Sequence, residues 1–226
     1  MAITFGGATS DRLTLQVQSA SNNLNPFTWT FWAFCTTRNS SRVIIAKNST
    51  SQKMARLNGS TGNVELLVGR ATTGADYITS DTPLAANTWK YFAFTFDSTA
   101  AAGSLIHIYS GSLTSSIVES TYGTKTDGSG AVSTDSSQGF VIGNNSGALS
   151  AFQGRIANFS VWNRILTTGE LIDQQFNPHM ETGCVLFTPL FDTSLLVDYS
   201  GHLIASNFTL TGGASGSHVP IPPLFN

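Results

Sequence analysis

Short segments in which apolar and polar residues alternate recur along the chain, and this period of two is typical of strands whose faces meet different surroundings. Turn residues such as Asn58-Gly59 and Asp127-Gly128 separate the segments. The pattern predicts strands at residues 12–18, 27–36, 42–47, 53–57, 63–69, 76–79, 89–97, 104–110, 116–120, 138–143, 154–163, 184–190 and 207–211. Between two of them, the polar stretch 123–139 is predicted to be a long loop, of the kind that is usually functional or mobile.

The period changes after residue 166, where one short helix is predicted over 167–176. Thr167 is a suitable N-cap, and Glu170 stands three residues later, as a capping box requires. Leu171 and Phe176 supply an apolar side, and Pro178 follows the expected end. The sequence therefore predicts an N-terminal cap as well as the helix.

The strand before this helix, 154–163, has a regular alternation that assigns its faces. One predicted face holds Ile156, Asn158, Ser160 and Trp162, and the other holds Ala157, Phe159 and Val161. We expect Trp162 to be buried.

Many strands and one helix favour an all-β fold, a two-sheet antiparallel jelly-roll sandwich with one short helix. With 226 residues, 41% apolar residues and 15 Phe, the chain can build one substantial core, and we predict one domain over residues 1–216. Residues 217–226 form a proline-rich arm that cannot join a central strand. Because its apolar residues are costly to leave in water, we expect the arm to dock on its own sandwich or on a neighbouring subunit through Val219, Ile221, Leu224 and Phe225.

Charge is sparse and evenly spread, with 11% charged residues and a formal net charge of −2. Single, scattered Lys and Arg make no stripe that could follow phosphates, which argues against a nucleic-acid partner. No apolar run approaches the roughly 20 residues that span a bilayer, so no membrane insertion is expected. The first residues lack the basic and apolar regions of a secretory signal, and we expect no export signal.

The sequence carries no recognisable catalytic motif. Glycoside hydrolysis on a strand needs carboxylates spaced by two, and the four glutamates, Glu65, Glu119, Glu170 and Glu181, are isolated in the sequence. The four histidines are widely separated, and His107 is expected to be structural. We therefore predict a protein that is not an enzyme.

Two cysteines, Cys35 and Cys184, lie in apolar strands. A disulfide between them and a pair of free thiols are both compatible with the pattern. We favour free thiols, because a domain of this size needs no staple and no export signal is expected.

The stretch Phe152–Leu171 contains the elements Gly154-Arg155-Ile156, Trp162-Asn163-Arg164 and Thr167–Glu170. It resembles the closing strand and helix of laminin G-like domains in the concanavalin A-like lectin/glucanase superfamily. Further segments resemble the family's other strands in the same order, namely 5–15, 27–34, 89–97, 104–111 and 140–144. The resemblance covers most of the chain and implies a concanavalin A-like sandwich.

Two kinds of site follow from this resemblance. A Ca²⁺ site would use Asp11 of the opening turn and Asn158, where the family commonly has Asp. The alternative, which we favour, is that Asp11 ends a turn and Asn158 hydrogen-bonds within the sheet. A glycan site would use Tyr77 and Tyr122 as aromatic platforms with the amides of Asn144 and Asn145, whereas simple packing is the favoured role of the two tyrosines.

The proline-rich end further resembles laminin G-like proteins encoded by bacteriophages. It implies a virion surface protein, such as a capsid decoration, head fibre or tail-associated protein. Its partners would be other virion proteins or copies of itself, together with cell-surface glycans. The alternative is a secreted, extracellular carbohydrate-binding module or adhesin domain.

Overall fold

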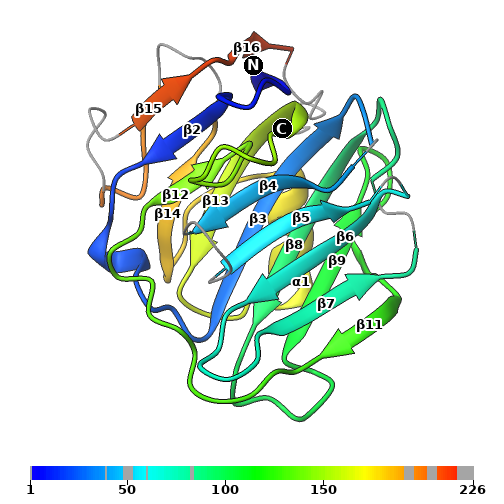
Figure 1. The fold of residues 1–226 in the computed structure, drawn as a ribbon, viewed down its shortest axis with the longest axis vertical. Helices are drawn as coiled ribbons and strands as arrows, with labels where there is room; N and C mark the ends of the chain where they lie inside the picture. The colour runs from blue at the N-terminus through cyan, green and yellow to red at the C-terminus, as the bar shows by residue number, and fades with distance from the viewer. Residues whose placement is uncertain are drawn as a thin grey trace.

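The computed structural model describes residues 2–38, 40–47, 53–59, 61–81, 84–190, 196–202 and 208–217, and its strands form two antiparallel sheets. Sheet A has the order β10 (Val118–Glu119), β9 (Ile106–Gly111), β8 (Trp89–Phe96), β3 (Phe27–Cys35), β13 (Gln153–Trp162), β1 (Ala2–Gly6) and β16 (Ala214–Gly216). β14 (Cys184–Thr188) continues beside β13 beyond the end of β1. Sheet B has the order β11 (Tyr122–Thr126), β7 (Ala75–Thr79), β6 (Asn63–Val68), β5 (Lys53–Asn58), β4 (Arg42–Lys47), β12 (Phe140–Ile142), β2 (Arg12–Leu15) and β15 (Phe208–Thr211). The predicted jelly-roll sandwich is confirmed, and sheet B lies in front of sheet A in Figure 1.

Aromatic side chains fill the space between the sheets. Trp29 of β3 meets Phe140 of β12 with ring centroids 5.4 Å apart, so the contact joins sheet A to sheet B. Phe31 and Phe94 stack at 5.6 Å on adjacent strands of sheet A. All four rings are at most 2% exposed, and each buried ring of this size contributes roughly 1.5–3 kcal/mol through burial.

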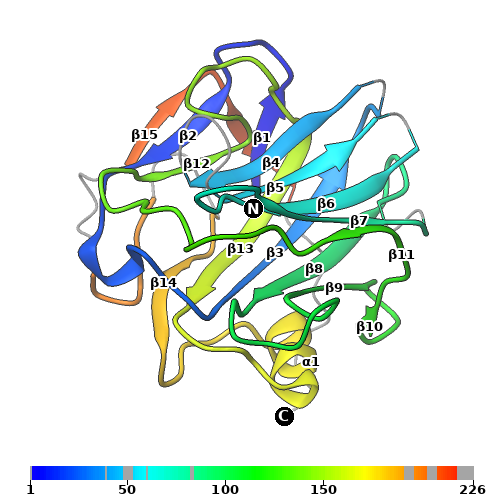
Figure 2. The same ribbon diagram turned by 60° about the horizontal axis from the view of Figure 1, so that its bottom comes forward.

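The helix α1 (Thr168–Phe176) lies over the outer face of sheet A, and a 3-10 turn, Ser19–Ser21, precedes β3. Figure 2 shows α1 below β8 and β9, on the side away from sheet B. Beneath the helix, Trp32, Tyr91 and Trp162 form a second apolar cluster with Leu171. The expected burial of Trp162 is confirmed, since the ring has no exposed surface.

The predicted cap of this helix is confirmed. The Thr167 hydroxyl accepts from the Glu170 N–H at 3.3 Å, and the Glu170 carboxylate accepts from the Thr167 N–H at 2.7 Å. A local sequence signal was enough here because both partners lie within one turn.

The predicted faces of β13 are wrong on one side of Asn158. This residue has a left-handed φ of 52°, and the register with β3 shifts between Ala157 and Ser160. Ile156 therefore points into the sandwich with Phe159 and Val161, while Trp162 points outward. One bulge residue reverses the alternation, which a period of two cannot anticipate.

The stretch 123–139 is not a loop throughout, so that prediction is wrong in part. Residues up to Thr126 belong to β11, which pairs with β7 at the edge of sheet B. Farther along, Ser129 and Val132 form isolated bridges with Thr73 and Arg70. The short strands β1 and β16, which alternation did not mark, pair with each other at the edge of sheet A.

The favoured state of the cysteines is confirmed, since both thiols are free. Cys35 pairs with Gly154 and Cys184 with Trp162, at positions eight residues apart on β13. Eight residues of strand span roughly 26 Å, far beyond the reach of a disulfide.

Candidate functional site

A pocket with a volume of about 430 Å³ opens on the outer face of sheet A, where β3 ends and β8 begins. Two aromatic residues from the strands form part of its wall, and a loop after β9 supplies the opposite side. Its lining is Phe34, Asn87, Thr88, Trp89, Ser112, Leu113 and Thr114.

The aromatic wall follows from strand pairing. Phe34 and Trp89 are direct partners in the β3–β8 ladder, so their side chains lie on the same face with ring centroids 5.6 Å apart. On the other side of Phe34, its β13 partner Arg155 places its guanidinium 4.5 Å from the ring centre. The row Trp89, Phe34, Arg155 thus presents two apolar rings followed by a fixed cation.

The rim of the pocket is polar but uncharged. Asn87 has a left-handed φ of 57°, and its N–H donates to the Cys35 carbonyl at 2.7 Å, which fixes the turn before β8. The side chains of Asn87, Thr88 and Thr114 are exposed, so amide and hydroxyl groups surround the rings.

The opposite wall is held by Gln175 of α1, which has no exposed surface. Its side-chain amide donates to the carbonyls of Ser112 at 2.7 Å and Ser115 at 2.8 Å, and its oxygen accepts from the Ile117 N–H at 2.9 Å. A Cβ at Gly111 would come within 2.6 Å of this amide, so the close approach needs glycine there. The loop 112–117 is therefore preorganised by the helix.

The two tyrosines predicted as a sugar platform come together elsewhere, in sheet B. Tyr77 and Tyr122 meet edge to face at 5.6 Å, and the Lys125 ammonium lies 4.4 Å from the Tyr122 ring centre. Tyr77 has no exposed surface, and burial raises the pKa of its hydroxyl to about 12. Its hydroxyl donates to Asp127 at 2.5 Å. A ring buried in this way has no free face for a sugar.

The predicted Asn144 and Asn145 join the opening turn to the loop before β13. The buried Asn144 amide donates to the carbonyls of Thr9 at 2.9 Å and Asp11 at 3.2 Å, and its oxygen accepts from the Asn145 N–H at 2.8 Å. Asn145 in turn accepts from the Leu149 N–H at 3.1 Å. Both side chains thus organise the backbone, and neither lines the pocket described above.

The two residues of the predicted Ca²⁺ site do not converge. The Asp11 carboxylate accepts from the N–H groups of Gly6 at 2.8 Å and Ala8 at 3.2 Å, as a turn-ending residue does. Gly6 pairs with Gln153, five residues along β13 from Asn158, which corresponds to roughly 16 Å. Asn158 itself forms the bulge, where its N–H donates to the Pro189 carbonyl at 3.0 Å. The predicted assembly arm, Val219, Ile221, Leu224 and Phe225, lies outside the described residues and stays a prediction.

A buried ion cluster holds the loop before β12. Asp135 accepts from Lys53 at 2.7 Å and lies 3.3 Å from the Lys47 ammonium, with all three side chains at most 2% exposed. Burial lowers the pKa of Lys47 to about 8, against the attraction of Asp135. Burial raises the pKa of Asp135, but the two lysines and the Asn23 N–H outweigh it, so the pKa lies below its ordinary range.

The outer face of sheet B carries a carboxyl pair on neighbouring strands that the sequence did not reveal. Glu65 of β6 and Asp76 of β7 lie near each other on this face, and burial together with the Glu65 charge raises the pKa of Asp76 to about 6. Glu65 also meets Arg56 at 2.6 Å and accepts from the Asn58 amide at 2.6 Å, with no exposed surface. A carboxylate enclosed in this way cannot reach a substrate.

A third cluster, Asp173, His179 and Glu181, stands at the C-terminal end of α1 and could hold a metal ion. One ligand atom from each residue lies within 4.8 Å of the others. The sequence signal was weak because the spacing 173, 179 and 181 matches no common metal-binding motif.

Sequence reasoning missed the pocket because Phe34 and Trp89 lie 55 positions apart and read as ordinary core residues. One signal was present: β3 and β8 carry aromatic residues at consecutive positions, so large rings must occur on both faces of sheet A. Rings on an outer face must be covered or used for binding.

Comparison with known proteins gives a consistent fold. A family model of the laminin G type, described as the concanavalin A-like lectin/glucanases superfamily, matches residues 6–171. No curated protein matches the chain. A putative carbohydrate binding protein from Bacteroides ovatus has a TM-score of 0.66 at 19% identity, over 98% of this chain and 63% of that one. This chain therefore spans less than two thirds of that relative's length.

Two further solved structures share the fold. The heptameric SAP-like pentraxin of Limulus polyphemus has a TM-score of 0.60 at 14% identity, over 95% of this chain and 94% of that one. Tailspike protein 2 of Escherichia coli O157:H7 bacteriophage CAB120 has a TM-score of 0.55 at 14% identity, over 84% of this chain and 30% of that one. Within the described residues, no helix is long and apolar enough to cross a membrane.

Proposed function

Because the chain belongs, through residues 6–171, to the laminin G-like part of the concanavalin A-like lectin/glucanase superfamily, we propose that it is a non-enzymatic protein that binds glycans in the pocket beside Phe34 and Trp89. The observation that carries the proposal is the aromatic wall with its uncharged polar rim. The C–H face of a pyranose packs against aromatic rings, and its hydroxyls bond to amides and hydroxyls. The printed description of the Bacteroides ovatus structure, a putative carbohydrate binding protein, supports the same class of ligand.

The absence of carboxylates from the pocket lining supports binding without catalysis. Glycoside hydrolysis generally needs two carboxyl groups on either side of the scissile bond. The polar side-chain groups of the described lining are an amide, hydroxyls and the indole N–H of Trp89. The Glu65–Asp76 pair belongs to the other sheet, and Glu65 has no exposed surface.

A glycan array followed by isothermal titration calorimetry with the best ligand tests this proposal. We expect Trp89→Ala to weaken binding at least tenfold, because one of the two rings is lost. Since Trp89 is only 9% exposed and its loss also affects packing, Asn87→Ala is the second variant, because it removes an exposed amide from the rim. Tyr199→Ala is the matched control, an aromatic residue 52% exposed outside the pocket.

Equal binding by the native protein and both pocket variants would place the ligand elsewhere. Binding that is lost in Tyr199→Ala and kept in Trp89→Ala would have the same meaning. Release of reducing sugar from the bound glycan would contradict the non-enzymatic part of the proposal.

We further propose that this protein is displayed on a phage particle, through contacts of residues 217–226 with other virion proteins or with copies of itself. The shared fold of the CAB120 tailspike and the low-charge surface rich in Ser, Thr and Asn support this placement. The alternative is a secreted carbohydrate-binding module or adhesin domain.

Mass spectrometry of purified particles separates these two placements. We expect the protein in the particles, and we expect deletion of 217–226 to lower its incorporation while the sandwich stays folded. Normal incorporation of the truncated protein would exclude the arm as the docking element. Particles without the protein, with the protein recovered from the medium, would favour the secreted module.

A further inference from the structure

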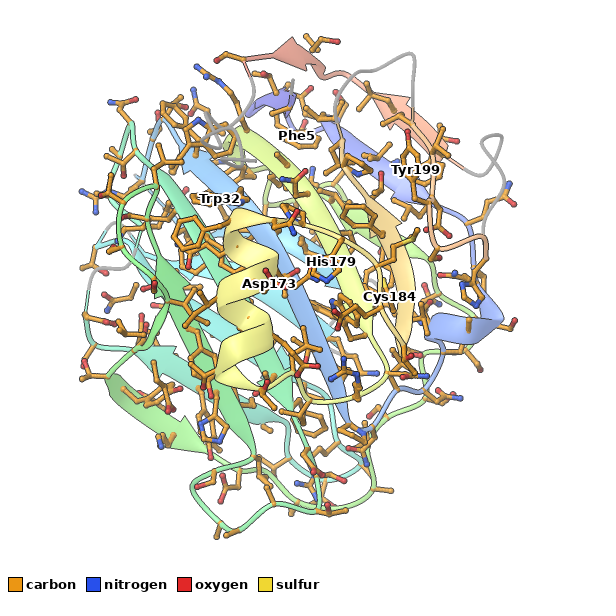
Figure 3. All side chains as sticks on the ribbon, turned by 180° about the vertical axis from the view of Figure 1, so that it is seen from behind. Phe5, Trp32, Asp173, His179, Cys184 and Tyr199 are labelled. Carbon is orange, nitrogen blue, oxygen red and sulfur yellow. The ribbon has the colours of Figure 1, made fainter. Side chains whose placement is uncertain are left out.

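We propose that Asp173, His179 and Glu181 form a binding site for a divalent cation of the first transition row, with Zn²⁺ as the best match, at the C-terminal end of α1. Figure 3 labels Asp173 and His179 of this site. This inference does not rest on the proposed glycan binding. It uses different residues, and its test needs no sugar.

The ligand atoms of Asp173 and Glu181 both lie near that of His179, as the binding of one small ion requires. His179 Nε2 lies 2.8 Å from Glu181 Oε1 and 3.7 Å from Asp173 Oδ2. At Zn–N and Zn–O bonds of about 2.0–2.2 Å, neighbouring ligands of a tetrahedral site stand roughly 3.3 Å apart, between these two distances. Asp173 and Glu181 are exposed and can adjust by rotation, and a water would complete the four positions.

The orientation of the imidazole is the second observation that points to a cation. His179 Nδ1 lies 2.6 Å from the Asn177 carbonyl, which can only accept, so Nδ1 carries the hydrogen. Nε2 then faces two carboxylates, and the positive charge between them can be supplied by a proton on Nε2 or by a metal ion that replaces this proton. Metal-binding histidines commonly donate their other N–H to a backbone carbonyl in this manner.

The surroundings hold the ligands in place, and the neighbouring cation Arg164 pairs more closely with Glu170 than with Glu181. Gln174, only 3% exposed, donates to the His179 carbonyl at 3.0 Å and so fixes the loop after the helix. Arg164 lies 2.7 Å from Glu170 and 3.8 Å from the second oxygen of Glu181, which leaves Glu181 Oε1 to face His179. The last turn of α1 has no basic residue, and the negative end of the helix dipole favours a cation.

The ligand set selects among cations. One imidazole and two carboxylates suit Zn²⁺ and its neighbours in the first transition row. Ca²⁺ takes six to eight oxygen ligands, and Mg²⁺ demands octahedral oxygen geometry, so neither should bind here with comparable strength.

The test is isothermal titration calorimetry with ZnCl₂ as the probe. The full chain is first treated with a chelator and dialysed to remove bound metal. We expect one Zn²⁺ per chain, and at least a tenfold loss of affinity in both His179→Ala and Glu181→Gln. His202→Ala is the matched control, because His202 is exposed and bonds to Ser200 rather than to this cluster. CaCl₂ and MgCl₂ should give no comparable binding.

Co²⁺ provides an independent readout, since a nitrogen and oxygen ligand set gives it visible absorption bands that His179→Ala should remove. Unfolding curves without metal check that each variant is folded, and Glu181→Gln, an exposed and nearly isosteric change, keeps the test valid where His179→Ala is unstable. Zn²⁺ affinity that is unchanged in folded His179→Ala and Glu181→Gln would overturn the proposal. So would affinity lost only in His202→Ala, or no Zn²⁺ binding by the native chain.

Discussion

Along the strands of both sheets, residues on the outer face alternate with residues that point into the shared core. The two outer faces are covered in different ways. On sheet A the outward residues Trp32, Tyr91 and Trp162 are at most 1% exposed, because α1 and its flanking segments lie over them. On sheet B the outward residues include Arg56 and Glu65, which form an ion pair on the sheet itself. Apolar outward residues thus require a cover, whereas charged ones can be satisfied by their cross-strand neighbours.

The largest expected effect concerns the covered face. Trp162→Ala should lower the free energy of unfolding by about 3–5 kcal/mol, because it empties a large fully buried site beneath α1. Chemical denaturation measures the change. Val118→Ala is the control at a residue 67% exposed, where the change should stay within about 0.5 kcal/mol. Equal effects of the two substitutions would show that the helix contributes no cover.

On the outer face of sheet B, removing Glu65 from its ion pair with Arg56 should lower the free energy of unfolding by less than Trp162→Ala does. Glu65→Ala should destabilise the fold by about 2 kcal/mol, because Arg56 and Asn58 lose their carboxylate partner while Arg56 stays partly solvated. Denaturation of Glu119→Ala, which removes an exposed carboxylate paired with His107, provides the comparison. If Glu119→Ala lowers the free energy of unfolding by as much as Glu65→Ala does, the burial of Glu65 is not the cause of the loss.

The same face should make stability depend on pH. The pKa of Asp76 is raised to about 6 by burial and by Glu65, so the native state holds this proton more tightly than the unfolded chain. Its contribution is fully present below the ordinary pKa near 3.8 and is lost as the pH rises through about 6. Asp76→Asn should therefore flatten the profile between these values and add about 1 kcal/mol at pH 7.

Thermal unfolding across this pH range measures the effect of Asp76→Asn. Asp81→Asn, at an exposed position, should leave the profile of the native protein unchanged. A gain of stability at pH 4 rather than at pH 7 would contradict the sign of the Asp76 shift.

The smallest expected effect concerns the N-terminal cap of α1, the helix that covers the outer face of sheet A. Thr167→Ala should cost about 0.5–1 kcal/mol, because the Glu170 N–H loses its hydroxyl partner. Thr168→Ala changes an adjacent exposed threonine that has no capping role, and denaturation should show almost no loss. A larger loss in Thr168→Ala would refute the cap as the start of the helix.

Local and cross-strand features differed in how far the sequence could predict them. Thr167 and Glu170 lie one turn apart, so their pairing was predictable, and the alternation in 154–163 predicted the burial of Trp162. The bulge at Asn158 depends on a backbone conformation that alternation does not encode. Phe34 and Trp89 meet only through the register of β3 and β8, and Gln175 closes their pocket from a helix more than 80 positions farther along. Contacts of this kind depend on tertiary pairing.

The buried Asp135 also has a consequence for the kinetics of unfolding. Its partners Asn23 and Lys53 lie 112 and 82 positions away in sequence, so their bonds form only after distant segments have met. Interactions that are absent from the folding transition state act mainly on the unfolding rate. The cluster of Asp135 with Lys47 and Lys53 should therefore prolong the lifetime of the folded sandwich, with little influence on how fast the sandwich forms.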